Sequence, residues 1–127
     1  MEKKVIHTEK APAAIGPYSQ AIEAGGFVFI SGQIAFEPAS GELLLGDIET
    51  ETKQVMTNLS AILTAAGLTF QNVVKSTIFL KDMNDFAKVN SIYGAYFTSD
   101  PPARETVQVA GLPRNVNVEI SVIAKTN

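Results

Sequence analysis

Arg104 is the residue of this chain best suited to bind a small anion. It opens an extended segment directly after a double proline, Asp100-Pro101-Pro102-Ala103-Arg104. The planar guanidinium presents a fork of donors that can hold a carboxylate through two parallel hydrogen bonds. Proline fixes φ, so the approach to Arg104 is stiff. The alternative for the same pattern is an arginine paired with a glutamate on an outward strand face.

Glu119 is the candidate acid or base. It lies between Val118 and Ile120 in an alternating C-terminal segment, so its carboxylate is expected to leave the face that packs in the core. Partial burial would raise its pKa and suit it to proton transfer. The alternative is an outward, solvated glutamate.

Four further residues are out of place locally. Tyr18 follows Gly16-Pro17, which puts a phenol on a stiffened loop, although a core aromatic explains it equally well. Ser31 and Gly32 interrupt the most apolar segment and offer a hydroxyl and close backbone access, or else mark a bulge. Asn90 puts an amide on an apolar helix face, where burial requires hydrogen-bond partners and where bracing the backbone is the alternative role.

These candidates must be positioned by two helices and a set of strands. An apolar stripe predicts a helix from about Asp47, its N-cap, to Ala66, and a second helix capped by Asp82 or Asn84 runs to about Phe97. Between these elements, Glu37 to Gly46 reads as a loop. Alternating or apolar runs predict strands, with Gly25-Gly26 as a hairpin turn, at Val5-Ile6 (a short candidate), Gln20 to Ala24, Phe27 to Phe36, Val73 to Leu80, the segment from Arg104, and Val116 to Ala124.

The order of the main elements, β-β-α-β-α-β-β, predicts a single α+β domain over residues 1–127. Its simplest packing is a mixed sheet with two helices on one face. Period-2 alternation places Arg104, Thr106 and Gln108 together, and we expect them on the uncovered face. Association between copies of the chain would cover that face and place a ligand site at the interface.

Composition excludes several classes of function. Of 127 residues, 46% are apolar and 18% charged, which is typical of a globular protein. A net charge of −3 gives no electrostatic footprint for nucleic acid or for an anionic membrane. With no cysteine and one histidine, neither a thiolate nucleophile nor a histidine-based metal site is expected. No run reaches the ~18 apolar residues of a membrane span, and the N-terminus lacks an apolar signal core, so we expect a cytoplasmic protein.

Several segments together resemble the reactive intermediate deaminase (Rid, YjgF-like) family, and they cover essentially the whole chain in order. The strand glutamate and the arginine both stand at matching positions, which is typical of the archetypal deaminase subgroup. Thr106 stands where some relatives have cysteine, and the segment before Pro102 is short, which affects the width of the pocket. The matching segments are Ala11-Pro12-Ala13-Ala14-Ile15-Gly16-Pro17-Tyr18-Ser19-Gln20, Ser31-Gly32-Gln33-Ile34, Phe86-Ala87-Lys88-Val89-Asn90, Pro102-Ala103-Arg104 and Val118-Glu119-Ile120-Ser121-Val122-Ile123-Ala124.

The resemblance implies a chorismate-mutase-like fold and a homotrimer with three sites between subunits. It also implies hydrolysis of 2-imino acids, such as 2-iminobutanoate and 2-iminopropanoate, to 2-oxo acids and ammonia, without cofactor or metal. By position, Arg104 would clamp the substrate carboxylate and Glu119 would position or activate water. The residues that would line the pocket are Tyr18, Ser31, Gly32, Asn90 and Thr106.

The implied chemistry suits the residues of this chain. An imine is already electrophilic, so a carboxylate clamp and one acid or base suffice for hydrolysis. Two rival functions stay open. One is a non-catalytic module that binds 2-oxo acids and regulates a partner. The other is an endoribonuclease that inhibits translation, which is disfavoured by an acidic chain with no basic stripe and no pair of histidines.

Overall fold

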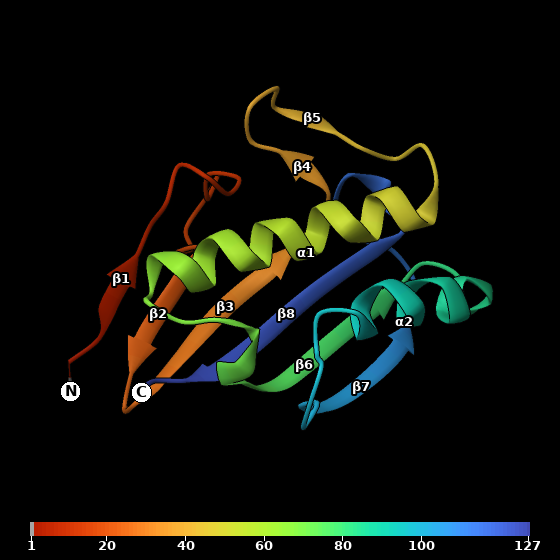
Figure 1. Cartoon of the computed structure of the whole chain (residues 1–127). Helices are drawn as coiled ribbons and strands as arrows, with labels where there is room; N and C mark the ends of the chain where they lie inside the picture. Colours follow the sequence, from red (N-terminus) through yellow and green to blue (C-terminus); the bar gives the residue numbers. More distant parts are fainter. Residues whose placement is uncertain (1) are drawn as a thin grey trace.

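Two helices cover one face of a six-stranded sheet in the computed structural model, which describes residues 2–127 (Figure 1). The strand order is β1-β2-β3-β8-β6-β7; β6 and β7 pair in parallel and the other neighbours are antiparallel. The predicted α+β class and mixed sheet are therefore confirmed. The sheet strands are β1 (Lys4–Ile6), β2 (Ala21–Ala24), β3 (Phe27–Gln33), β6 (Val73–Leu80), β7 (Ala103–Gln108) and β8 (Val118–Lys125), and the helices are α1 (Ile48–Ala65) and α2 (Phe86–Gly94).

Helix α1 matches its prediction to within one residue at each end. The Asp47 side chain caps it by accepting a hydrogen bond from the Thr50 N–H at 2.8 Å. This bond is the main reason that the pKa of Asp47 lies below its usual range. Gly67, with φ +76°, ends the helix in the left-handed conformation that glycine tolerates best. The buried stripe of α1 packs on β3 and β8, so this helix holds the centre of the sheet.

Helix α2 is shorter than predicted. Asp82, one of the two predicted caps, begins a 3₁₀ turn (Met83–Asp85) by accepting the backbone N–H two residues on at 2.9 Å. The α-helix ends at Gly94, three residues before the predicted end. Beyond Gly94 the backbone tightens, because the N–H groups of Tyr96 and Phe97 donate to the carbonyls three residues earlier at 3.1 and 3.2 Å. The rings of these two residues pack 5.2 and 5.4 Å from the ring of Phe70.

The predicted loop from Glu37 to Gly46 is partly wrong. It contains most of a small hairpin, β4 (Phe36–Glu37) and β5 (Glu42–Leu43), which forms a separate two-stranded sheet. Strand β3 accordingly ends at Gln33 rather than at Phe36.

A β-bulge interrupts the pairing of β3 with β8. Ile30 pairs with Val122, but Gln33 pairs with Ile120. Strand β3 therefore contains one more residue than β8 over this stretch, at Ser31-Gly32. Bulges of this kind re-aim side chains and are frequent next to ligand sites.

The face assigned to Arg104 from the sequence is wrong. In the parallel pairing of β6 with β7, Arg104 lies beside Ser76 and Thr106 beside Ile78, and both β6 residues are buried toward the helices. Arg104, Thr106 and Gln108 therefore point to the helix side of the sheet. The three residues do share one face, as the alternation predicts. Which face of the sheet they share depends on the pairing of β7 with β6, which the sequence does not show.

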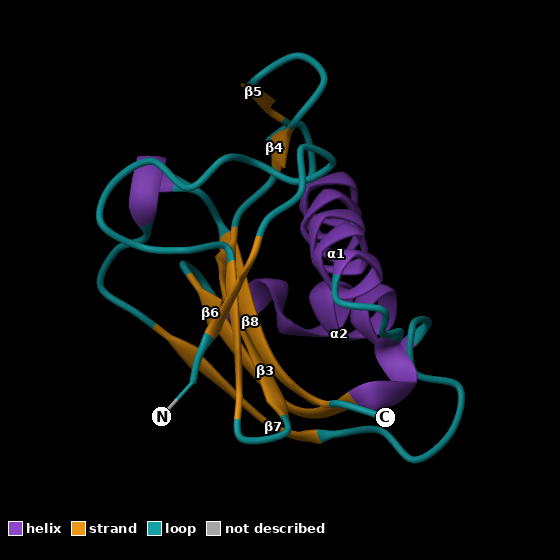
Figure 2. Ribbon diagram, turned by 90° about the vertical axis from the view of Figure 1, so that its left-hand side faces the viewer, coloured by secondary structure: helices purple, strands orange, loops and turns teal. Residues whose placement is uncertain are grey.

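Among residues 2–127, both α-helices lie on the same side of the sheet and leave its opposite face without one (Figure 2). The strand registers place a band of apolar side chains there, and several of them are strongly exposed: Phe29 is 45% exposed and Val107 is 40% exposed. We call this surface the open face; its apolar members are Val5, Ile22, Phe27, Phe29, Phe79, Val107 and Ile123. Such a large uncovered apolar surface is typical of an interface. Within residues 2–127, neither helix is long and apolar enough to span a bilayer.

Candidate functional site

The predicted site residues divide into two sets on opposite faces of the sheet. Tyr18, Ser31, Gly32 and Glu119 line one cavity of about 630 Å³, here called the glutamate cavity. Asn90 and Arg104 line a second cavity of about 420 Å³, here called the arginine cavity. One chain therefore does not bring Arg104 and Glu119 together.

Glu119 lies on the open side of β8, as its alternation predicts. Its neighbours Val118 and Ile120 are buried under the helices, whereas Glu119 is half-buried in the glutamate cavity. Burial raises the pKa of the Glu119 carboxyl above its usual range, because the ionised form loses hydration. A carboxylate with a raised pKa is suited to exchange a proton with water.

Gly32 provides the space in which the Glu119 side chain lies. A Cβ atom added at Gly32 would overlap Oε2 of Glu119 and would lie 2.9 Å from its Cδ and 3.1 Å from its Cγ. The carboxylate therefore rests against the backbone of the bulge, where any other residue would displace it. This contact gives Gly32 a physical role that does not depend on an unusual φ.

The remaining walls of the glutamate cavity are fixed by two hydrogen-bonded side chains. The Ser31 hydroxyl donates to the Ser19 carbonyl at 2.6 Å, beside Tyr18. Gln20, only 2% exposed, accepts from the Thr8 N–H at 2.8 Å and donates to the Pro12 carbonyl at 2.8 Å. The loop that carries Tyr18 is thus fastened at both ends to β3 and to the segment after β1. Tyr18 itself is exposed, so it is not a core aromatic.

Arg104 is oriented by α2. Its Nη1 donates to Oδ1 of Asn90 at 2.6 Å, and its guanidinium lies 5.2 Å from the ring centre of Tyr93 and 5.7 Å from that of Phe86. Asn90 therefore braces the arginine side chain rather than the backbone. Within residues 2–127 no carboxylate pairs with Arg104, so the guanidinium keeps donors for an anion.

Tyr93 closes the inner end of the arginine cavity. Its hydroxyl donates to Oγ of buried Ser76 at 2.8 Å. Burial raises the pKa of Tyr93, although the Ser76 hydrogen bond and the charge of Arg104 act in the opposite direction. Tyr93 is therefore a neutral support for the guanidinium.

Thr106 contributes an unpartnered hydroxyl. Its Oγ1 is buried and has no hydrogen-bond partner among the described residues. It lies two residues after Arg104 on the same face of β7, but it does not line either cavity. A buried hydroxyl without a partner costs stability, which is the pattern expected where a ligand or a second chain supplies the partner.

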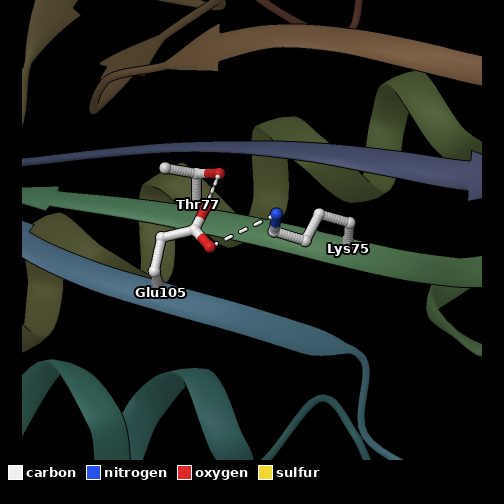
Figure 3. Close-up of polar contacts among 3 residues, drawn as sticks. All are labelled: Lys75, Thr77 and Glu105. Carbon is white, nitrogen blue, oxygen red and sulfur yellow. Dashed lines mark hydrogen bonds and ion pairs between the residues drawn. The ribbon is translucent and has the colours of Figure 1, made fainter.

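Glu105, the residue after Arg104, forms an ion pair with Lys75 and not with Arg104. On the open face its Oε1 lies 3.2 Å from Nζ of Lys75 and its Oε2 accepts from the Thr77 hydroxyl at 2.9 Å (Figure 3). The Thr77 hydrogen bond, followed by the contact with Lys75, lowers the pKa of Glu105. The paired-arginine alternative from the sequence is therefore wrong.

Two relevant residues were missed from the sequence. Arg114 lines the glutamate cavity, in the turn before β8. Glu51 on α1 is fully buried and accepts hydrogen bonds from the Asn117 N–H at 2.8 Å, the Asn117 amide at 2.8 Å and the Val118 N–H at 3.2 Å. It thereby fixes the start of β8, directly before Glu119. Two features of the sequence could have pointed to them. Arg114 directly follows Pro113 in a turn, and Glu51 is a carboxylate within the apolar stripe of α1.

Comparisons with known proteins identify the family. The sequence profile described as "Endoribonuclease L-PSP" matches residues 8–126. The chain belongs to this family. It is 55% identical over 122 residues to a RutC family protein of Pyrococcus horikoshii, covering 96% of this chain and 97% of the relative. It is also 55% identical over 122 residues to the 2-iminobutanoate/2-iminopropanoate deaminase of Mus musculus, covering 96% and 90%.

A solved structure of a Yersinia pestis protein from the conserved Rid protein family superposes with a TM-score of 0.96. It is 48% identical and the match covers 98% of this chain and all of that one. The predicted Rid resemblance and the fold are thus confirmed. The names of the relatives differ in detail, since some are deaminases and others carry only a family name.

Within the described part of this Rid-family chain, no group of three or more His, Cys, Asp or Glu side chains is arranged to hold a metal ion. What the site residues do offer is two complementary groups: an oriented guanidinium on one face and a carboxylate with a raised pKa on the other. Together these would bind an organic acid and move a proton, provided that they meet.

Proposed function

We propose that this chain hydrolyses 2-imino acids, such as 2-iminobutanoate and 2-iminopropanoate, to 2-oxo acids and ammonia. Relatives at 52–55% identity from several mammals carry the name 2-iminobutanoate/2-iminopropanoate deaminase. The observation that carries the proposal is a pair of charged groups with no ion-pair partner among residues 2–127, Arg104 braced by Asn90 and Glu119 against Gly32. A cytoplasmic location stays a prediction.

The proposed site is completed by a second copy of the chain. Arg104 and Glu119 lie on opposite faces of one sheet, so a site that uses both needs Arg104 from one subunit and Glu119 from another. The apolar open face supports self-association, since burial of exposed Phe29 and Val107 against another subunit is favourable. We propose the homotrimer that the family resemblance implies, and sedimentation velocity at micromolar concentration measures it.

The proposed reaction needs few groups. Arg104 holds the substrate carboxylate through two hydrogen bonds and fixes the C=N carbon near water. Glu119 takes a proton from that water as the water oxygen bonds to the carbon, and passes this proton to the imine nitrogen, which becomes an amino group. The resulting carbinolamine then loses ammonia: Glu119 takes the hydroxyl proton and gives it to the amino nitrogen, the hydroxyl oxygen forms the C=O bond, and the C–N bond breaks.

The test generates 2-iminobutanoate from threonine with a pyridoxal-phosphate-dependent dehydratase and follows the initial rate at which semicarbazide forms a semicarbazone, because the imine reacts with semicarbazide faster than 2-oxobutanoate does. The wild-type protein should lower this rate as its concentration rises. Arg104→Ala should slow this hydrolysis by tens- to hundreds-fold, because a bidentate charge-assisted contact contributes about 2–3 kcal/mol. Arg104→Lys should also be slow, since a point charge does not reproduce the fork.

Glu119→Gln separates catalysis from binding. If Glu119 handles water, this variant should keep its calorimetric affinity for 2-oxobutanoate and lose hydrolysis, whereas Arg104→Ala should lose both. Lys53→Gln, on the exposed side of α1, controls for the loss of one charge. A wild-type protein that binds 2-oxobutanoate but leaves the rate of semicarbazone formation unchanged would be a binding module and not an enzyme.

A further inference from the structure

Arg114 is held in a strained backbone conformation. Its φ of 56° and ψ of 20° lie in the left-handed region, which costs a non-glycine residue about 1–2 kcal/mol. The turn is closed by a hydrogen bond from the Val116 N–H to the Pro113 carbonyl at 3.2 Å. Strain of this kind is concentrated at ligand sites, where the surrounding structure holds a side chain in place.

The guanidinium of Arg114 lies 5.3 Å from the ring centre of Phe36, and the backbone that carries this ring is held from α1. The buried Asn58 amide donates to the backbone carbonyls of Ile34 at 3.1 Å and Phe36 at 2.9 Å. Gln54 in turn donates to Oδ1 of Asn58 at 2.9 Å. Packing over the ring leaves the edge of the guanidinium, which carries its donors, available for hydrogen bonding.

Arg114 has no acidic partner among residues 2–127. It lines the same cavity as Glu119, and the walls of this cavity include the apolar side chains of Pro12, Ile15 and Ile34. In the single chain the cavity measures about 630 Å³, which is more than a four-carbon acid occupies. The glutamate cavity therefore combines the carboxylate of Glu119, an apolar wall and the positively charged side chain of Arg114, which can bind an anionic group.

We infer that the glutamate cavity favours 2-imino and 2-oxo acids that carry a second anionic group at the end of an aliphatic chain, with Arg114 binding that distal group. This inference rests on the proposed function for the end of the substrate that carries the imine. Arg104 of the neighbouring subunit then holds the first carboxylate, the apolar wall packs on the methylene groups, and Arg114 decides which side chain is preferred.

The test compares two 2-oxo acids with the same carbon chain. 2-Oxoglutarate ends in a carboxylate and 2-oxopentanoate ends in a methyl group. Calorimetric titration of the assembled wild-type protein should show 2-oxoglutarate binding about tenfold more tightly, as expected for one charge-assisted contact at a solvent-accessible site. Arg114→Gln should bring the ratio of the two affinities close to one, and Lys53→Gln should leave that ratio at its wild-type value.

Arg114→Gly is the second variant, because glycine relieves the left-handed strain. It should raise the melting temperature and abolish the preference, which a merely structural arginine would not do. A wild-type protein that binds 2-oxopentanoate as tightly as 2-oxoglutarate, or binds neither, overturns the inference; so does an Arg114→Gln variant that keeps the preference. Hydrolysis of 2-iminobutanoate is measured separately, so a protein active on that imine without a preference for dicarboxylates refutes this inference alone.

Discussion

A site built from two subunits should be restored by mixing two inactive variants. Arg104→Ala removes the substrate clamp and Glu119→Gln removes the group proposed to handle water, and each alone should be inactive. In a mixed assembly, some sites draw Arg104 from a Glu119→Gln subunit and Glu119 from an Arg104→Ala subunit. Those sites carry both intact groups.

The expected recovery follows from the placement of the two residues on opposite faces of the sheet. With equal amounts of both variants and random assembly, each partner of a site is the required one with even chance. About one site in four is then intact, so the mixture should recover about a quarter of the wild-type rate. This fraction is the same for a dimer and a trimer, and therefore tests shared sites without assuming the number of subunits.

The assay co-expresses the two variants in equal amounts with different tags, confirms on a small sample that mixed assemblies form, and measures hydrolysis of 2-iminobutanoate on the unsorted mixture. The matched control mixes wild type with the double variant Arg104→Ala/Glu119→Gln. Shared sites predict about a quarter of the wild-type rate there as well, whereas sites within one chain predict about half. Mixed assemblies of the single variants that stay as inactive as either parent would show that one chain supplies both residues, and the reasoning from opposite faces would be refuted.

Three further predictions concern the supports of the site. Gly32→Ala should reduce hydrolysis about as strongly as Glu119→Gln while the circular dichroism spectrum is retained, because the new Cβ occupies the space of the carboxylate; an active Gly32→Ala variant would mean that Glu119 works from another position. Folding raises the pKa of Glu119, so this group's contribution to stability is present at low pH and is lost as the pH rises through the folded-state value. Glu119→Gln should therefore melt at a higher temperature than wild type near pH 7 and show little gain near about pH 4, and an equal gain at both values would contradict the raised pKa. Glu51→Gln should lower the free energy of unfolding by about 2–4 kcal/mol in denaturant titrations, since its amide would face the donors of Asn117 or Val118, and an unchanged midpoint would refute that role.

Local signals predicted the elements well. The stripe of α1 and its Asp47 cap gave bounds within one residue, and the strand from Val73 to Leu80 matches its prediction at both ends. The direction of Glu119 also followed from alternation with Val118 and Ile120. These features depend on the spacing of apolar residues and on helix capping, and both are determined by residues close together in the sequence.

The features that were missed depend on contacts between distant segments. The face of Arg104 is set by parallel pairing with β6, and the Ser31-Gly32 bulge by the register of β3 against β8. The left-handed backbone conformation of Arg114 could not be predicted from its residue type, because glycine or asparagine is normally found in that conformation. The sequence could therefore nominate residues for the site, but could not distribute them between the two faces.

The position of β8 in the sheet has a consequence for how the chain is made. This strand lies between β3 and β6 but follows both of them in the sequence, and the Thr126 hydroxyl donates to the carbonyl of Gly26, 100 residues earlier. A nascent chain therefore leaves the edges of β3 and β6 that pair with β8 unfilled until β8 has left the ribosome. Contacts so distant in sequence slow folding and expose strand edges to aggregation. Loss of residues 118–127 would remove the middle of the sheet, so the sheet should form only after β8 has been synthesised.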